Sequence, residues 1–149
     1  MEEKKEHIPH PIELFGVECG KGWYDLLTPI IEYVEEYNKD TEEDNQIKFL
    51  QIKEKWGGLR VYTNFGTREL FDLIDKAEEE SYKVCEFCGS REEVGMTLSG
   101  WYSTTCLDCV KKMAKERDYP IRWGRNSDKK VFWINPDGTM EETEKVEEP

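Results

Sequence analysis

Four of the five cysteines fall into two closely spaced pairs, and this spacing is the strongest chemical signal in the sequence. Two residues separate Cys85 from Cys88, seventeen residues follow, and Cys106 and Cys109 repeat the same spacing. Two such turns place four thiolates around one ion in a tetrahedral shell. We therefore predict that these four residues hold one structural Zn²⁺. A disulfide pair, free thiols and an iron site of the rubredoxin type are the alternatives.

The residues that follow the two pairs differ, which indicates the kind of zinc finger. Gly89 follows the first pair and permits the positive φ that turns backbone amides toward sulfur, so this pair is typical of a zinc knuckle. The second pair runs into the helical pattern Val110–Ala114, for which Thr104 or Thr105 is the expected N-cap. A knuckle, a hairpin and a helix in this order predict a treble-clef finger over residues 85–118.

The finger needs a body to carry it, and residues 14–84 predict an α-β-β-α domain. Apolar residues at helical spacing predict a helix that ends near Asn38. Pro29 is expected to interrupt this stripe, so that a short turn precedes the helix. A second helix is expected from an N-cap at Thr67 to about Tyr82.

Between these helices, residues 47–65 predict a β-hairpin with Gly57-Gly58 as its turn. With this turn Glu54 faces Val61, and the residues on the two strands alternate between an apolar and a polar side. The apolar side comprises Leu50, Ile52, Trp56, Leu59, Val61 and Phe65, and the polar side comprises Gln51, Lys53, Lys55, Arg60, Tyr62 and Asn64. Glu54 falls on the apolar side and needs a partner, for which Arg60, Arg68 or a backbone amide would serve.

The polar side of the hairpin gathers Lys53, Lys55 and Arg60 beside Tyr62, and we take it as the candidate binding surface. Lys55 and Arg60 are expected to be cross-strand neighbours, where like charges repel. Something must offset this repulsion. An internal carboxylate from residues 78–80 is one partner, and an anionic ligand such as a nucleotide, a phosphate or an acidic protein patch is the other.

Three further segments flank this framework. Residues 1–13 predict a flexible leader, and residues 141–149 predict an acidic disordered tail. Residues 119–140 predict a C-terminal β-hairpin packed on the rest, with strands near 121–123 and 131–135.

The tryptophans divide by their positions. Trp23, Trp56 and Trp101 fall where helix, hairpin and finger should meet, so we expect them in the core. Trp123 and Trp133 are the better candidates for exposure.

Charge and the rarity of histidine exclude several classes of function. The net charge of −12 repels phosphate backbones, and the only histidines are His7 and His10 in the leader. A catalytic zinc with histidine ligands is therefore not expected, and neither a P-loop nor a nucleophile elbow occurs. Without an apolar run long enough for a bilayer or a signal peptide, we expect a non-enzymatic cytoplasmic protein with no membrane partner. Cys19 is expected to be a buried or half-buried thiol.

The segment from Gln51 to Tyr62 resembles a signature of small phage and prophage proteins of uncharacterised function. The resemblance includes Gly22-Trp23 at the first helix, the K-E-K-[aromatic]-G-x-L-R hairpin, an acidic helix and a C-x-x-C-G knuckle that leads to a second cysteine pair. It covers about residues 20–112. It implies a phage or prophage origin and expression in a bacterial cytoplasm, and it brings almost no function with it.

Together these features predict an α+β protein, in which a helix–β-hairpin–helix layer is fused to a treble-clef zinc finger with a C-terminal β-hairpin. We expect a phage-type accessory or regulatory protein that binds a host protein, for instance as an inhibitor or counter-defence factor. A nucleic-acid-binding protein is the first alternative, and it would combine the hairpin face with Arg122, Arg125, Lys129 and Lys130. The second alternative is a binder or sponge for a small anionic ligand or nucleotide, which requires a concave pocket.

Overall fold

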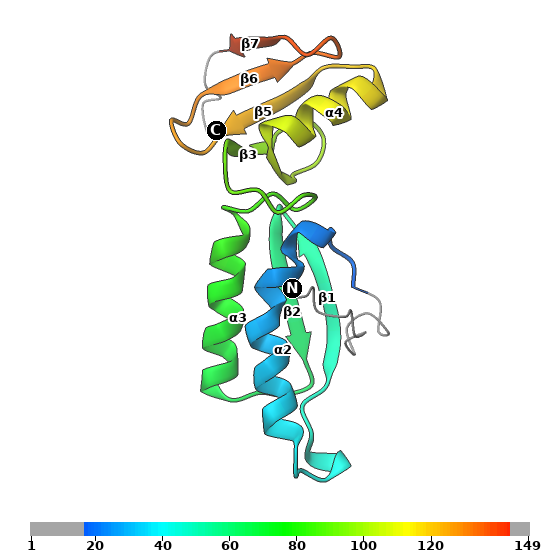
Figure 1. The fold of residues 1–149 in the computed structure, drawn as a ribbon, viewed down its shortest axis with the longest axis vertical. Helices are drawn as coiled ribbons and strands as arrows, with labels where there is room; N and C mark the ends of the chain where they lie inside the picture. Colours follow the sequence, from blue (N-terminus) through cyan, green and yellow to red (C-terminus); the bar gives the residue numbers. More distant parts are fainter. Residues whose placement is uncertain (1–16, 144–149) are drawn as a thin grey trace, which may run out of the picture.

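The computed structural model describes residues 17–143, which form two lobes arranged end to end (Figure 1). The fold class is α+β, as expected, because helices accompany two antiparallel sheets. The predicted leader (1–13) and residues 144–149 of the predicted tail lie outside the described residues.

The first lobe is the body that the two helices and the hairpin were predicted to form. In chain order it contains the 3-10 helix η1 (Lys21–Trp23), α2 (Tyr24–Asn38), the 3-10 helix η2 (Glu43–Asn45), β1 (Phe49–Lys55), β2 (Gly58–Thr63) and α3 (Arg68–Ser81). The second lobe carries the cysteine pairs and contains β3 (Val94–Thr97), β4 (Thr104–Cys106), α4 (Leu107–Arg117), β5 (Ile121–Arg125), β6 (Val131–Ile134) and β7 (Met140–Thr143).

Helix α2 passes through Pro29, although we expected the proline to mark a break. A proline inside a helix removes one backbone hydrogen bond and costs about 3 kcal/mol. Leu27, Ile30 and Val34 of the same helix are almost completely buried. Burial of each such side chain stabilises the fold by roughly 1.5–3 kcal/mol, so the packing of the stripe outweighs the proline.

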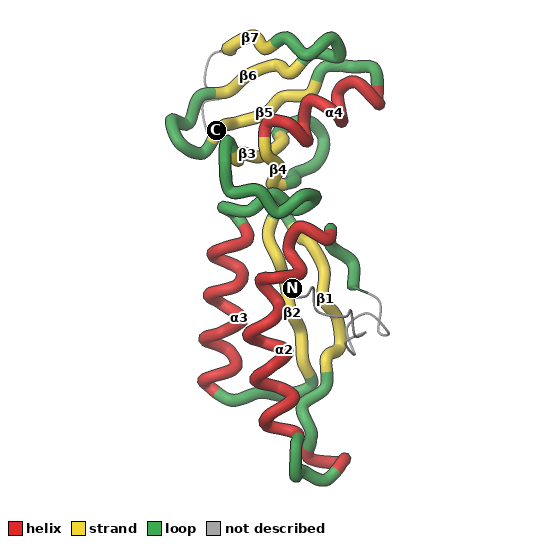
Figure 2. Tube along the Cα trace, in the orientation of Figure 1, coloured by secondary structure: helices red, strands yellow, loops and turns green. Residues whose placement is uncertain are grey.

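Helix α3 begins as predicted, with Thr67 as its N-cap. The Thr67 hydroxyl accepts a hydrogen bond of 3.0 Å from the Leu70 N–H and shares one of 2.6 Å with the Tyr33 hydroxyl of α2. The two helices lie side by side and pack on the hairpin (Figure 2). Their core includes Trp23 and Ile52.

The turn of the hairpin is Trp56-Gly57, one residue earlier than predicted. Both residues have positive φ, 57° and 83°, as a type I′ turn requires. Gly58 instead pairs with Lys55 at the start of β2. A Cβ at Gly58 would overlap the Tyr82 hydroxyl, so this glycine allows close packing and is not needed for the turn.

The shifted turn changes every cross-strand partner of the hairpin but keeps the alternation of its two sides. Lys53, and not Lys55, lies opposite Arg60, and Glu54 faces Leu59. Glu54 accepts a 2.8 Å hydrogen bond from a backbone amide of the turn, which is one of the three partners that we expected. Ile52, Leu59 and Val61 are buried on the helix side, whereas three members of the predicted apolar side are exposed: Leu50, Trp56 and Phe65.

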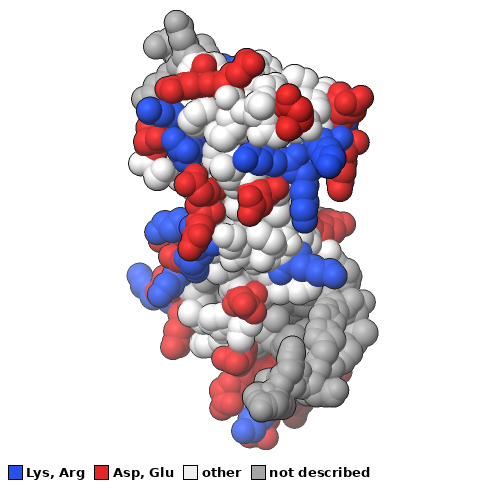
Figure 3. Space-filling model, turned by 45° about the horizontal axis from the view of Figure 1, so that its top comes forward, with Lys and Arg blue, Asp and Glu red and all other residues white. Residues whose placement is uncertain are grey.

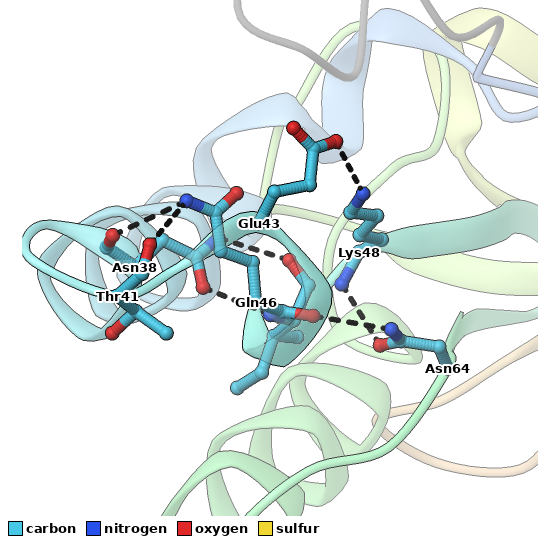
Figure 4. Close-up of polar contacts among 7 residues, drawn as sticks. Asn38, Thr41, Glu43, Gln46, Lys48 and Asn64 are labelled. Atoms are coloured by element: carbon cyan, nitrogen blue, oxygen red, sulfur yellow. Dashed lines mark hydrogen bonds and ion pairs between the residues drawn. The ribbon is translucent and has the colours of Figure 1, made fainter.

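Side-chain amides close the end of the first lobe that is distant from the cysteines (Figure 4). Asn38 donates to the Ile47 carbonyl over 2.9 Å and accepts from the Ile47 N–H over 2.8 Å, as a neighbouring strand would. Asn64 similarly donates to the Gln46 carbonyl and accepts from the Lys48 N–H. These contacts hold the polar loop between α2 and β1 in place.

The second lobe has a five-stranded sheet in the order β4-β3-β5-β6-β7. The predicted C-terminal hairpin therefore extends the sheet of the finger. Residues 141–143, which we expected in a disordered tail, belong to β7 and pair with β6. Strand β5 lies between β3 and β6, and its Ile121 and Trp123 are completely buried in the cluster that includes residues of α4.

The expected distribution of tryptophans was wrong for two of the five. Trp123 is buried because it lies on a central strand covered by α4, and Trp56 is 64% exposed because it occupies the hairpin turn. Trp23 is buried as expected, and Trp133 is 37% exposed. Trp101 is half-buried, with the Arg117 guanidinium 4.4 Å from its ring centre.

The two lobes meet where the first cysteine pair contacts η1, which leads directly into α2. The Gly22 N–H donates to the Glu86 carbonyl over 2.8 Å, and the Trp23 indole N–H donates to the Val84 carbonyl over 2.8 Å. The hairpin turn contributes a second contact, because the Thr104 hydroxyl donates to the Gly57 carbonyl over 2.7 Å. In each of these three contacts the acceptor is a backbone carbonyl of the other lobe.

Replacing Gly22 by Ala should lower the free energy of unfolding by roughly 1–3 kcal/mol, as overpacking does. The new Cβ would overlap the Cys85 carbonyl oxygen, which belongs to a backbone that cannot rotate away. Gly124→Ala is the control, since its backbone is not in the left-handed region and the added Cβ would meet only the end of the flexible Leu98 side chain, at 3.3 Å, and a Val131 methyl at 3.9 Å. Urea denaturation of both variants tests this, and equal losses would contradict the close packing.

Candidate metal centre

The side chains of Cys85, Cys88, Cys106 and Cys109 converge, with all four sulfur atoms within 4.8 Å of one another. The Sγ atoms of Cys88 and Cys106 are 3.6 Å apart. Tetrahedral zinc with Zn–S bonds of about 2.3 Å requires sulfurs about 3.8 Å apart, so the cluster has the size of a metal site. All five cysteines of the chain are free thiols, which does not support the disulfide alternative.

The first pair lies in a tight turn that directs backbone amides at sulfur. Gly89 has a φ of 82°, as expected, and its N–H donates to the Cys85 carbonyl over 3.0 Å. The Phe87 N–H donates to the Cys85 sulfur over 3.4 Å. The Ser90 N–H donates to the Cys88 sulfur. Such amides stabilise thiolates over thiols.

The second pair begins helix α4, where the positive end of the helix dipole favours thiolates. Cys106 is itself the N-cap and accepts a hydrogen bond of 3.4 Å from the Cys109 N–H. The predicted N-caps, Thr104 and Thr105, lie instead in β4, and their hydroxyls form hydrogen bonds with groups outside α4. Thr105 Oγ1, for example, accepts a 3.0 Å hydrogen bond from the Trp123 indole.

A knuckle, the β3–β4 hairpin and α4 follow one another in the arrangement of a treble clef. Buried Val94 of β3 packs between the two halves of the cluster, against Cys85 and Cys106. The two pairs, seventeen residues apart in sequence, are thus brought together by one short antiparallel pairing.

The electrostatics of the cluster favour a bound cation. Burial raises the pKa of Cys106 to about 11 and also raises the pKa of Cys109. Burial has the same tendency at Cys88, but hydrogen bonds from the Ser90 amide and the neighbouring thiols outweigh it and lower the pKa. Four thiolates at this spacing repel one another, and a divalent cation removes that repulsion. The donor set therefore fits a metal ion.

Cys19 lies apart from the cluster as a half-buried thiol, as expected. Its pKa is raised to about 12, first by burial and then by the charges of Glu86 and Glu54. Glu86, between the first two cysteines, is buried, and its side chain accepts a 3.0 Å hydrogen bond from the Gly20 N–H. Burial raises the pKa of Glu86 to about 7.

The candidate residues of the hairpin face separate into two groups. Arg60 reaches α3, where its Nη1 lies 2.7 Å from Oε2 of Glu78, so the internal carboxylate that we considered is present. Lys53 and Lys55 have no carboxylate of residues 17–143 within ion-pair distance, which is 4.0 Å. Tyr62 is 42% exposed on the same side.

Of the four cations considered in the C-terminal hairpin, the two arginines are engaged, whereas Lys129 and Lys130 form no ion pair with a carboxylate of residues 17–143. Arg125 lies 2.8 Å from an oxygen of Asp128 and 3.5 Å from one of Glu93. The Arg122 guanidinium lies 5.8 Å from the ring centre of Trp133. On the face drawn in Figure 3, basic and acidic residues are interspersed.

An exposed aromatic pair at the lobe junction was missed by the sequence interpretation. Trp56 of the hairpin turn and Tyr102 of the β3–β4 loop have ring centres 6.0 Å apart. The Gly-Gly that follows Trp56 was a signal for its place in the turn, but nothing in the sequence indicated that Tyr102 would lie beside it.

Replacing Arg60 by Ala should lower the free energy of unfolding. We expect the loss to exceed the about 1 kcal/mol of an exposed ion pair and to stay below the roughly 3–5 kcal/mol of a buried one. The reason is that the side chains of Arg60 and Glu78 are 26% and 31% exposed. Lys55→Ala serves as the control and should leave the melting temperature unchanged. Thermal melts of both variants decide the matter, and early melting of Lys55→Ala alone would reverse the two assignments.

Within residues 17–143, no helix combines the length and the apolar character that crossing a membrane requires. No family model, curated protein or solved structure matches this chain. The functional interpretation therefore depends on the four-cysteine cluster and on the surfaces that surround it.

Proposed function

We propose that the four cysteines bind one Zn²⁺ with a structural role. The convergence of four sulfurs from a knuckle and a helix start carries this proposal. Four cysteines complete a tetrahedral shell and leave no open position for a substrate, as in structural zinc sites. An iron site of the rubredoxin type would use two equivalent knuckles, whereas here the second pair opens a helix.

We further propose that the protein acts without catalysis, by binding a protein of a bacterial host. The resemblance to phage and prophage proteins supports such a partner, for which an inhibitor or counter-defence factor is one form. The exposed aromatic pair at the lobe junction supports protein binding, because tryptophan and tyrosine are enriched at interfaces.

The two alternatives have less support. A nucleic-acid-binding surface would need its cations available, but Arg60 and Arg125 are each paired with carboxylates and the net charge is −12. A small anionic ligand would need a concave site around Lys53 and Lys55, which lie on the outer side of a two-stranded sheet.

Purified protein should contain about one zinc per chain, and Cys88→Ser should lose the metal together with the structure of the finger. The reason is that structural zinc supplies folding free energy directly. Elemental analysis and hydrogen exchange of residues 85–118 measure the two effects. Cys19→Ser is the matched control and should retain zinc. A metal-free protein of unchanged stability, or one that contains iron, would refute the assignment.

A tagged chain should capture a host protein from bacterial lysate in a zinc-dependent way. The native chain should retain the partner after nuclease treatment, and Cys88→Ser should not. Quantitative mass spectrometry of the captured material, with Cys19→Ser as control, measures the difference. Loss of all captured material on nuclease treatment would instead favour the nucleic-acid alternative.

A further inference from the structure

Neither the backbone conformation of Trp56 nor the exposure of its side chain is favourable for a tryptophan. Its φ of 57° is in the left-handed region, where asparagine and glycine are preferred and a bulky residue costs free energy. Its side chain is 64% exposed, so little hydrophobic stabilisation offsets that cost. Backbone strain of this kind is concentrated at functional sites, so a strained and exposed tryptophan indicates a role in binding.

Tyr102 supplies a second exposed aromatic ring beside it. The Tyr102 side chain is 43% exposed, and the two rings are inclined by 47° with their centres 6.0 Å apart. Trp56 belongs to the first lobe and Tyr102 to the second. The Thr104 hydroxyl of the second lobe donates a 2.7 Å hydrogen bond to the carbonyl of Gly57, the residue after Trp56. The pair is therefore held in place before any partner binds, which reduces the entropic cost of association.

Two lysines of β1 precede Trp56 in the chain. Lys55 precedes Trp56 directly, and Lys53 projects from the same side of β1. No carboxylate of residues 17–143 forms an ion pair with either lysine. The neighbouring Glu54 lies on the opposite side of the strand, where it holds the Gly57 amide. Glu18 pairs with Lys53 through the backbone, but its carboxylate accepts a 3.3 Å hydrogen bond from Gln51. In a molecule with a net charge of −12, the end of β1 that leads into Trp56 thus carries two cations.

We propose that Trp56 and Tyr102, with Lys53 and Lys55, form the docking site for an acidic segment of the partner protein that contains an apolar or aromatic anchor. This inference rests on the proposed function in protein binding. The rings provide the contact area of an interface hot spot, and the lysines select carboxylates. A nucleic-acid strand is a poorer match, because it would bring one phosphate per nucleotide past a molecule of charge −12.

Selection from a yeast-displayed library of random dodecapeptides tests the site without knowledge of the partner. The full chain should enrich peptides in which aspartate and glutamate flank an apolar residue. Enrichment of basic peptides, or of none, would overturn the proposal. A fluorescent oligo-dT strand, tested in parallel, should not bind, and tighter binding of oligo-dT than of the selected peptide would also overturn it.

Variants then connect the selected peptide to the proposed residues. Trp56→Gly should weaken its binding by at least about tenfold, as loss of a hot spot does, while the melting temperature stays the same or rises because the backbone strain is relieved. Tyr102→Ser and the double variant Lys53→Gln/Lys55→Gln should also weaken binding. Phe71→Ala and Tyr119→Ser remove aromatic rings elsewhere that are each 47% exposed, and they should leave binding unchanged. Equal effects of the two sets would refute the site.

The lysate experiment separates this inference from the proposed function. If Trp56→Gly still captures the host protein, the docking site is wrong and the proposed function stands. If peptides bind through Trp56 but no host protein is captured, the docking site stands and the proposed host partner fails.

Discussion

The close contact between the knuckle and the start of α2 is the constraint on which the rest of the structure depends. The knuckle, residues 85–89, presents the sulfurs of Cys85 and Cys88 to the metal position and the Glu86 carbonyl to the first lobe. Gly22 allows this approach because any side chain would overlap the knuckle backbone. Trp23 then donates its indole N–H across the junction while its ring fills the core of the first lobe.

Because of this constraint, a metal ion bound by the four cysteines would stabilise more than the finger. The buried residues form separate clusters in the two lobes, and the small cluster around Cys85, Val94 and Cys106 lies with the knuckle that joins them. A cation that neutralises the four thiolates would therefore stabilise the knuckle, and with it the surface against which α2 begins. The hairpin turn is held against β4 at the same junction, so the exposed pair Trp56 and Tyr102 depends on it too.

The basic residues fall into two groups, those that form ion pairs within the protein and those that do not. Arg60 and Arg125, two of the basic candidates, are paired with carboxylates: Arg60 with Glu78 of α3, and Arg125 with Asp128 in the turn of its own hairpin. Lys53 and Lys55 lack such partners among residues 17–143 and precede Trp56 in β1. The net charge of −12 is an average over the chain, whereas the proposed docking site consists of a few side chains at the lobe junction.

The sequence alone determined what depends on neighbours along the chain. The spacing of the cysteine pairs predicted their convergence, Thr67 predicted the start of α3, and strand alternation predicted the buried centre of the hairpin. Local chemistry suffices in these cases because the interacting groups are a few residues apart or lie on one periodic face.

Only the tertiary structure decided features that depend on contacts between distant segments. Gly58 is needed because a side chain there would overlap Tyr82, and it lies in β2 rather than in the turn. The turn falls at Trp56-Gly57 instead, so Trp56 is on the surface and not in the predicted core. Trp123 is buried because α4 and the strands on either side enclose β5, and residues 141–143 form a strand because β6 offers an edge. These outcomes were not predictable from local pattern, since each depends on a packing surface that exists only when several elements have assembled.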